Sequence, residues 1–229
     1  MNRLLRDCAG SVLVEATLSI TVFMLVVFGT VDVTLMLFNW QSANKAAVIG
    51  ARTAIVSNPV ASGITNLSSN YDPSLLGQSC LDTSTTDGNG GGPSGNCPQM
   101  SATCTPASSG GSCPMSCTAG GAGTCPSVSF DDTAFTTIFN NMHAIYPSLT
   151  RQNVVITYKT NNLGYVGQSN GLPMDVTVSI SCVSYQFYFI DALMKWVFST
   201  PSGCPSGTKK GVLIPSFATT LTSESMVTQ

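Results

Sequence analysis

Two acidic residues interrupt a long apolar stretch near the N-terminus of the chain. Between Ser11 and Trp40 the only ionisable side chains are Glu15 and Asp32. A carboxylate inside a membrane span is energetically costly, and an intramembrane acid usually has a partner. Because Glu15 lies so close to the start of this stretch, we expect it to need a partner group.

The chain contains nine cysteines, which would be unusual for a cytosolic protein. An oxidising compartment, in which cysteines form disulfides, is the natural location for so many. Zinc binding is the competing interpretation, but the spacings lack a pair of C-x-x-C knuckles, and the single histidine, His143, lies outside the cysteine cluster. The pattern therefore favours disulfides over a metal site.

The sequence shows no constellation for catalysis or for nucleotide binding. A Ser, His and acid mechanism needs a histidine within reach of a nucleophile, and nothing around His143 is distinctive. The glycine-rich run from Gly88 to Gly92 lacks the Gly-Lys-Ser/Thr ending of a phosphate-binding loop. A net charge of −2 gives no basic stripe for nucleic acid. We expect no enzymatic activity, no cofactor and no nucleic-acid partner.

The apolar stretch has the length and composition of a membrane span. Residues Ala16 to Val31 carry no charge, and Val33 to Phe38 extend the run, which is enough to cross ~30 Å of hydrocarbon as a helix. Arg3 and Arg6 precede the span and favour a cytoplasmic N-terminus. We therefore expect a single-pass protein in the lipid bilayer, with the remaining chain on the outer side.

The residues before the span resemble a known processing site. Gly10-Ser11-Val12-Leu13-Val14-Glu15 resembles the type IV prepilin cleavage motif. The resemblance implies that prepilin peptidase cuts after Gly10, so that Ser11 becomes the first residue and Glu15 the fifth. The cut would create an ammonium at Ser11, about one helical turn from a carboxylate that can pair with the ammonium of a neighbouring subunit.

Three patches resemble the TadE-like and TadF-like pseudopilins of tight-adherence (Flp) pilus systems. They are Gly10 to Thr17, Phe28-Gly29-Thr30-Val31-Asp32, and Lys45 to Ile55 with its Gly50-Ala51-Arg52-Thr53-Ala54. Such proteins often carry Arg three residues after the second acid, where this chain has Leu35. The resemblance covers roughly the first quarter of the chain. It implies partners among other pilin and pseudopilin subunits and the inner-membrane pilus assembly platform.

Cleavage after Gly10 would also remove Cys8 and leave an even number of cysteines. An even count in an outer domain suits four disulfides. Six of the remaining eight lie between residues 80 and 125, where Gly, Ser, Thr, Pro and Asn dominate, so we predict a disulfide-stapled surface insertion. We also hypothesise that the last two cysteines pair with each other. The eight are Cys80, Cys97, Cys104, Cys113, Cys117, Cys125, Cys182 and Cys204.

The helical pattern continues beyond the span to Asn58-Pro59, where proline and its predecessor disfavour a helix. We predict one helix over residues 11–57, for membrane insertion and assembly. Ala43, Ala47 and Ala51 form a small-residue face that allows a close helix approach. This face could contact neighbouring subunits or the chain's own domain, and the sequence favours neither.

Residues 58–229 are expected to form a pilin-like outer domain. Phe135 to Ile145 has the spacing of a short amphipathic helix, and Phe187 to Phe198 suggests a buried or membrane-grazing helix. Strands are predicted at Val154–Thr160, at Val176–Tyr185 and at Val212–Leu221, the last at an edge or bulge because of Pro215. The predicted fold class is α+β, with a long N-terminal transmembrane helix followed by a small domain that contains an antiparallel sheet.

These observations give a structural hypothesis and two alternatives. The first is a pseudopilin or minor pilin of the inner membrane, with a leader at residues 1–10 and a periplasmic C-terminal domain, used to assemble a tight-adherence pilus and support adhesion. It could also enter the extracellular pilus. The main alternative is an uncleaved single-pass protein with a disulfide-rich ligand-binding domain; a membrane-tethered hydrolase would rest on His143 alone.

Overall fold

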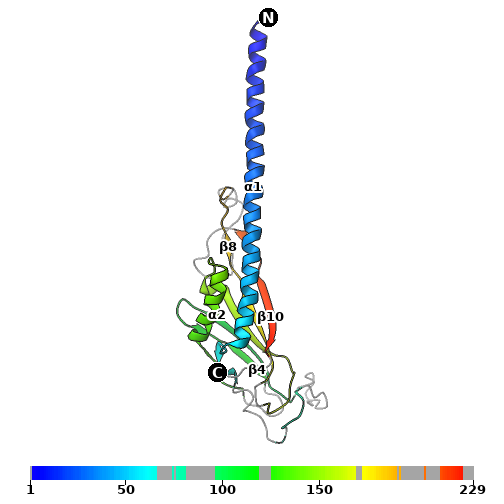
Figure 1. Cartoon of the computed structure of the whole chain (residues 1–229), viewed down its shortest axis with the longest axis vertical. Coiled ribbons are helices and arrows are strands. Elements are labelled where there is room, and N and C mark those ends of the chain that lie inside the picture. The colour runs from blue at the N-terminus through cyan, green and yellow to red at the C-terminus, as the bar shows by residue number, and fades with distance from the viewer. Residues whose placement is uncertain are drawn as a thin grey trace. The chain divides into compact units, whose positions relative to one another are not determined.

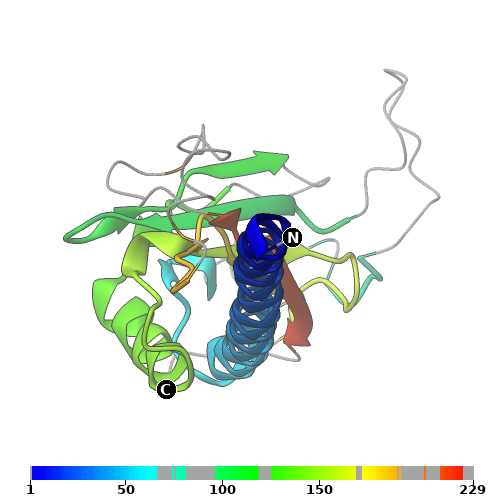
Figure 2. The same cartoon turned by 90° about the horizontal axis from the view of Figure 1, so that it is seen from above.

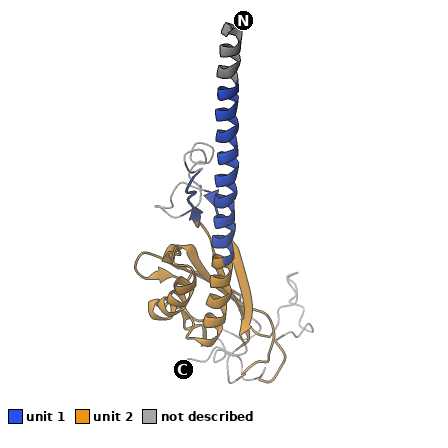
Figure 3. Ribbon diagram, turned by 45° about the horizontal axis from the view of Figure 1, so that its top comes forward, with its two compact units in different colours: residues 1–41, 184–214 blue, residues 42–183, 215–229 orange. Residues whose placement is uncertain are grey.

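A computed structural model of the whole chain describes residues 2–65, 74, 76–80, 96–118, 125–168, 172–189, 191, 204 and 212–223, with side chains from residue 12 onward except that of residue 118. The chain divides into two compact units (Figure 3). Unit 1 comprises Met1–Gln41 and Ser184–Ile214, and unit 2 comprises Ser42–Val183 and Pro215–Gln229.

One long helix, α1, runs through Asn2–Val56 and contributes to both units (Figure 1). The helix is free of proline, and it ends two residues before Asn58-Pro59, as the sequence predicts. The Ser57 N–H still donates to the Thr53 carbonyl at 2.9 Å, which closes the last turn. The prediction of a continuous N-terminal helix is confirmed.

Unit 1 contains a small antiparallel ribbon besides its part of α1. Strand β8, Ser184–Tyr185, pairs with β9, Val212–Leu213. The Tyr185 and Phe187 rings meet edge to face with their centroids 5.1 Å apart. The ribbon brings the start and the end of the 184–214 segment together.

Unit 2 contains an antiparallel sheet with strand order β10-β7-β6-β2-β3, in which β4 also pairs with β2. A separate pair is formed by β1 and β5. The bounds are β1 Ala61–Ser62, β2 Gln99–Pro106, β3 Gly111–Ser112, β4 Met115–Thr118, β5 Ser129–Phe130, β6 Val154–Thr160, β7 Met174–Ile180 and β10 Phe217–Ser223.

The strands alternate between a buried face and a polar face. On β6, Val154, Ile156 and Tyr158 are fully buried, whereas Thr157 and Lys159 lie on the opposite face. That opposite face carries a row of threonines in register across four strands, because Thr220 pairs with Thr177, Thr177 with Thr157, and Thr157 with Thr103. This face of the sheet is therefore rich in hydroxyl groups.

Helix α2, Asp132–Ile145, lies on the same side of the sheet as the C-terminal part of α1 (Figure 2). The carboxylate of Asp131 caps α2 by accepting the N–H groups of Thr133 at 2.8 Å and Ala134 at 3.0 Å. A Cβ added to Gly50 of α1 would stand 2.5 Å from the Met142 sulfur, so the glycine allows the two helices to approach closely.

Four predicted elements of the outer domain can be compared with the structure. The helix at Phe135 to Ile145 and the strand at Val154–Thr160 are confirmed. The strand predicted at Val176–Tyr185 is instead two strands, because Cys182 takes a left-handed conformation with φ of 59°. The strand with Pro215 is likewise divided into β9 and β10, and β10 lies at an edge of the sheet. The helix predicted at Phe187 to Phe198 lies largely outside the described residues.

The cysteine-rich segment between residues 80 and 125 differs from the prediction in one respect. Three disulfides staple it: Cys80–Cys97, Cys104–Cys113 and Cys117–Cys125. It is not only a surface insertion, however, because its strand β2 pairs with β6 inside the sheet and buries Met100, Ala102 and Cys104. Small apolar side chains at alternate positions are sufficient to fill this part of the core.

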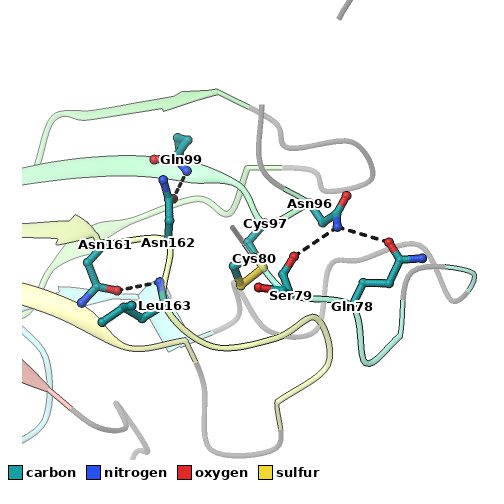
Figure 4. The surroundings of a disulfide bond; sticks show 9 residues. All are labelled: Gln78, Ser79, Cys80, Asn96, Cys97, Gln99, Asn161, Asn162 and Leu163. Carbon is teal, nitrogen blue, oxygen red and sulfur yellow. Dashed lines mark hydrogen bonds between the residues drawn. A yellow bond between two sulfur atoms is a disulfide. The ribbon is translucent and has the colours of Figure 1, made fainter. Parts of the chain in front are cut away.

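Polar side chains surround the first of these disulfides (Figure 4). The Asn96 amide donates to the Ser79 carbonyl at 3.1 Å and to the Gln78 side chain at 3.2 Å. Cys80 and Cys97 are themselves buried. The bridge therefore fixes a segment whose order comes from hydrogen bonds and a cross-link more than from apolar packing.

Candidate functional site: an apolar helix with two acids

The N-terminal part of α1 exposes apolar side chains over most of its length. Within the described residues it is the one helix long and apolar enough to cross a membrane. Leu13, Leu18, Phe23 and Phe38 are each more than 60% exposed. An apolar surface of this extent in a soluble monomer would be unusual, and it fits contact with lipid or with other apolar helices.

The polar side chains within this stretch hydrogen-bond to the helix itself. The hydroxyls of Thr17, Thr21, Thr30 and Thr34 donate to carbonyls three or four residues earlier, at 2.7 to 2.9 Å. This back-bonding satisfies a hydroxyl without help from water. The four threonines are therefore compatible with a hydrocarbon environment.

Glu15 differs from these threonines. It is exposed on α1, and no side chain in the described part of the chain pairs with it. Gly10 and Ser11 belong to the same helix, about one turn before Glu15. A carboxylate here requires a partner from outside the described chain if the helix lies in a membrane.

Asp32 has the opposite environment: its side chain is fully buried within unit 1. Its Oδ1 accepts the Tyr188 N–H at 3.1 Å, and its Oδ2 accepts the Phe189 N–H at 2.9 Å. One turn earlier on the helix, the Phe28 ring stacks on the Phe189 ring with centroids 4.6 Å apart. Phe28 and Asp32 thus form a docking point for residues 188–189.

The sequence singled out the Phe28 to Asp32 patch but gave no indication of its partner. The donors are backbone N–H groups more than 150 residues away, and backbone donors leave no signature in side-chain types. The absence of a base at Leu35 is consistent with this geometry. Two N–H donors can serve the carboxylate where an arginine is missing.

The small-residue face of α1 is occupied within unit 2. Ala43, Ala47 and Ala51 are fully buried, and so are Ala46 and Ala54. Their burial accords with the interpretation that this face packs on the chain's own domain.

The remaining residues that the sequence singled out are the cysteines and His143. Cys182 and Cys204 are each disulfide-bonded, in addition to the six cysteines of the three bridges above. His143 lies on an exposed part of α2, where its ring stacks on Phe139 and its Nδ1 is 3.1 Å from the Leu149 carbonyl oxygen. No cluster of three or more metal-ligating side chains occurs among the described residues.

A small cavity of about 260 Å³ lies in unit 2 where α1 ends beside the start of α2. Its lining includes Ser57, Asn58 and Thr137. The volume is below the roughly 300–1,000 Å³ of pockets that enclose drug-sized ligands. The cavity gives no argument for the ligand-binding alternative.

Comparison with known proteins finds one family model that matches the helical part of the chain. Residues 10–52 match the family model described as TadE-like protein. The segment 10–52 is a TadE-like domain. It begins at Gly10, includes Glu15 and Asp32, and ends four residues before the end of α1. No curated protein and no solved structure matches the chain.

The TadE-like domain supports involvement of the chain in a tight-adherence pilus system. It also supports association with a membrane and with pilus components, in agreement with the apolar helix. The described disulfides belong to the part of the chain that follows the TadE-like domain.

Proposed function

We propose that this chain is a pseudopilin or minor pilin of a tight-adherence pilus, cut after Gly10 by prepilin peptidase and supporting surface adhesion. Its role is structural and not enzymatic. Ser11 becomes the new N-terminus, and Glu15 pairs with the N-terminal ammonium of a neighbouring subunit.

The single observation that carries the proposal is the state of Glu15. It is an exposed carboxylate in an apolar helix, it has no partner within the described chain, and it stands at the fifth place after Gly10 in a TadE-like domain. An ammonium from another subunit would satisfy it, and each buried charge would supply the other's missing partner.

The proposed topology places the N-terminus in the cytoplasm and the C-terminal domain in the periplasm. Arg3 and Arg6 precede the span, which favours retention of the N-terminus inside. The disulfides of unit 2 require an oxidising compartment, which the periplasm supplies. Before assembly the subunit is stored in the inner membrane, in contact with the assembly platform.

Two substitutions test the proposal in cells that assemble the pilus. Gly10→Ala should block processing and leave the full-length chain in the membrane. Glu15→Gln should allow processing and membrane insertion but reduce incorporation into sheared pili or assembly complexes. Both results are read by immunoblotting of membrane and pilus fractions.

Gly29→Ala is the matched control for the glycine change, because a Cβ at Gly29 meets nothing within 4 Å and the residue lies in the same helix. This variant should be processed and assembled normally. Normal assembly of Glu15→Gln would contradict the proposed charge pair, and normal processing of Gly10→Ala would contradict the proposed cut site.

A further inference from the structure

The depth of Asp32 follows from the length of the helix, given the membrane anchoring that the proposed function assumes. In the sequence, the apolar run begins at Val12, directly after Gly10 and Ser11. Twenty residues at 1.5 Å each span ~30 Å, the thickness of the hydrocarbon core. With Val12 at the inner boundary, this count places Asp32 at the outer boundary of the core and Phe28 one turn inside it.

The docking point fixes residues 188–189 at this same depth. The Asp32 carboxylate accepts both backbone N–H groups, so neither the acid nor these donors require water. The stack between Phe28 and Phe189 places the Phe189 ring beside the last apolar turn of the span. Both ends of these contacts belong to unit 1.

The side chains of the docked residues remain largely exposed. Tyr188 is 76% exposed and Phe189 is 55% exposed, and Phe28 itself is 40% exposed. This aromatic patch, Phe28, Tyr188 and Phe189, is continuous with the apolar surface of the span. Aromatic side chains, and tyrosine in particular, are favoured at the level of the headgroups because one end is apolar and the other is polar.

We propose that Tyr188 and Phe189 form a second membrane contact, which inserts into the outer leaflet of the bilayer beside α1 and is held there by Asp32. The occupant of the aromatic patch is lipid. The buried acid of the TadE-like domain is then a positioning residue for a lipid-binding segment far away in the sequence.

Fluorescence quenching by labelled lipids tests this proposal on the full-length protein. A fluorescent amino acid replaces Tyr188, Phe23 or Trp40 in separate variants, each reconstituted in phosphatidylethanolamine and phosphatidylglycerol vesicles. The vesicles carry a quencher either on the headgroup or near the top of the acyl chain. Phe23 marks the middle of the span, and Trp40 marks a level ~12 Å beyond Asp32 along the helix.

We expect the acyl-chain quencher to reduce emission at position 188 several-fold more than at position 40. Emission at position 188 that no lipid label quenches, with normal quenching at position 23, overturns the lipid contact and leaves the membrane anchor intact. A label at position 23 that is also unquenched overturns the anchor, and with it both this proposal and the proposed function. Crosslinking of position 188 to a second copy of the chain in place of lipid overturns the choice of occupant.

The role of Asp32 is tested in the same vesicles. Asp32→Ala leaves two N–H groups without their acceptor, so the quenching at position 188 should fall toward the value at position 40 while position 23 is unchanged. Thr34→Ala is the matched control, because it removes a polar side chain near Asp32 on the same helix, one whose hydroxyl donates to the Thr30 carbonyl of the helix itself. Equal quenching at position 188 in wild-type and Asp32→Ala protein overturns the positioning role.

Discussion

Replacing Tyr158 with phenylalanine tests how unit 2 joins its sheet to the end of the long helix. Tyr158 lies at 0% exposure on β6, and its hydroxyl accepts the Val60 N–H at 3.0 Å. Val60 is also fully buried, just beyond the end of α1. Tyr158→Phe keeps the ring but leaves this N–H without an acceptor, which should cost about 1–3 kcal/mol of unfolding free energy.

The same substitution has a pH signature. Burial raises the pKa of the Tyr158 phenol, against a smaller lowering by the bond with Val60. Unfolded tyrosine ionises near pH 10, so above about that pH the unfolded chain binds fewer protons than the folded one and stability falls by ~1.4 kcal/mol per pH unit. Phenylalanine does not ionise, so the variant does not lose stability in this way. The difference in unfolding free energy between wild-type and Tyr158→Phe protein should therefore narrow above about pH 10.

The assay is urea unfolding of the full-length protein in detergent with its disulfides intact, followed by near-ultraviolet circular dichroism at about pH 8 and about pH 11. Tyr165→Phe is the matched control, since Tyr165 is 51% exposed, and it should change stability little. Equal stability of Tyr158→Phe and wild-type at the lower pH would refute the hydrogen-bond argument. A difference in unfolding free energy between wild-type and Tyr158→Phe protein that stays constant when the pH is raised would refute the titration argument.

Substitutions at three further places test the packing of unit 2. Asp131→Ala removes the cap of α2 and should cost about 1 kcal/mol in urea unfolding, whereas Asp131→Asn keeps an acceptor and should cost less; equal losses would contradict the capping role. Ala47→Leu overfills a fully buried position and should cost about 1–3 kcal/mol, and an unchanged unfolding midpoint would show that this face of α1 is not packed as described. Removing both Cys104 and Cys113 should cost roughly 2.5 kcal/mol by the loss of a short cross-link, and an unchanged unfolding free energy would contradict the stapling of β2.

The parts of the fold that sequence alone predicts are those with strong periodicity or punctuation. The end of α1 follows from Pro59, and β6 follows from the alternation of Val154, Ile156 and Tyr158 with polar neighbours. These signals are local, so no knowledge of the tertiary structure is needed to interpret them.

Strand β2 could not be predicted, because Ala102 and Cys104 are small and lie in a segment dominated by turn-forming residues. They are buried because Val154 to Thr160 provides a partner strand from elsewhere in the chain. The strand is divided at Cys182 because this residue has a left-handed backbone conformation. Cysteine rarely adopts that conformation, so the sequence offers no reason to predict it.

The candidate site also combines one residue that the sequence identifies with one contact that it does not. Glu15 stands out in the sequence because a charge in an apolar run is rare, and the TadE-like match includes it. The partner of Asp32 is invisible in the sequence, since the contact is made to the backbone of residues 188–189. Only a tertiary structure could connect the two segments.

The central claim is that the functional subunit is a cut chain that begins at Ser11. N-terminal sequencing, together with the intact mass, of the protein purified from cells with an active pilus system tests it most directly. We predict a mature chain that starts at Ser11 and lacks Cys8. A chain that retains Met1 or Asn2 would contradict the pilin proposal and favour an uncleaved single-pass membrane protein.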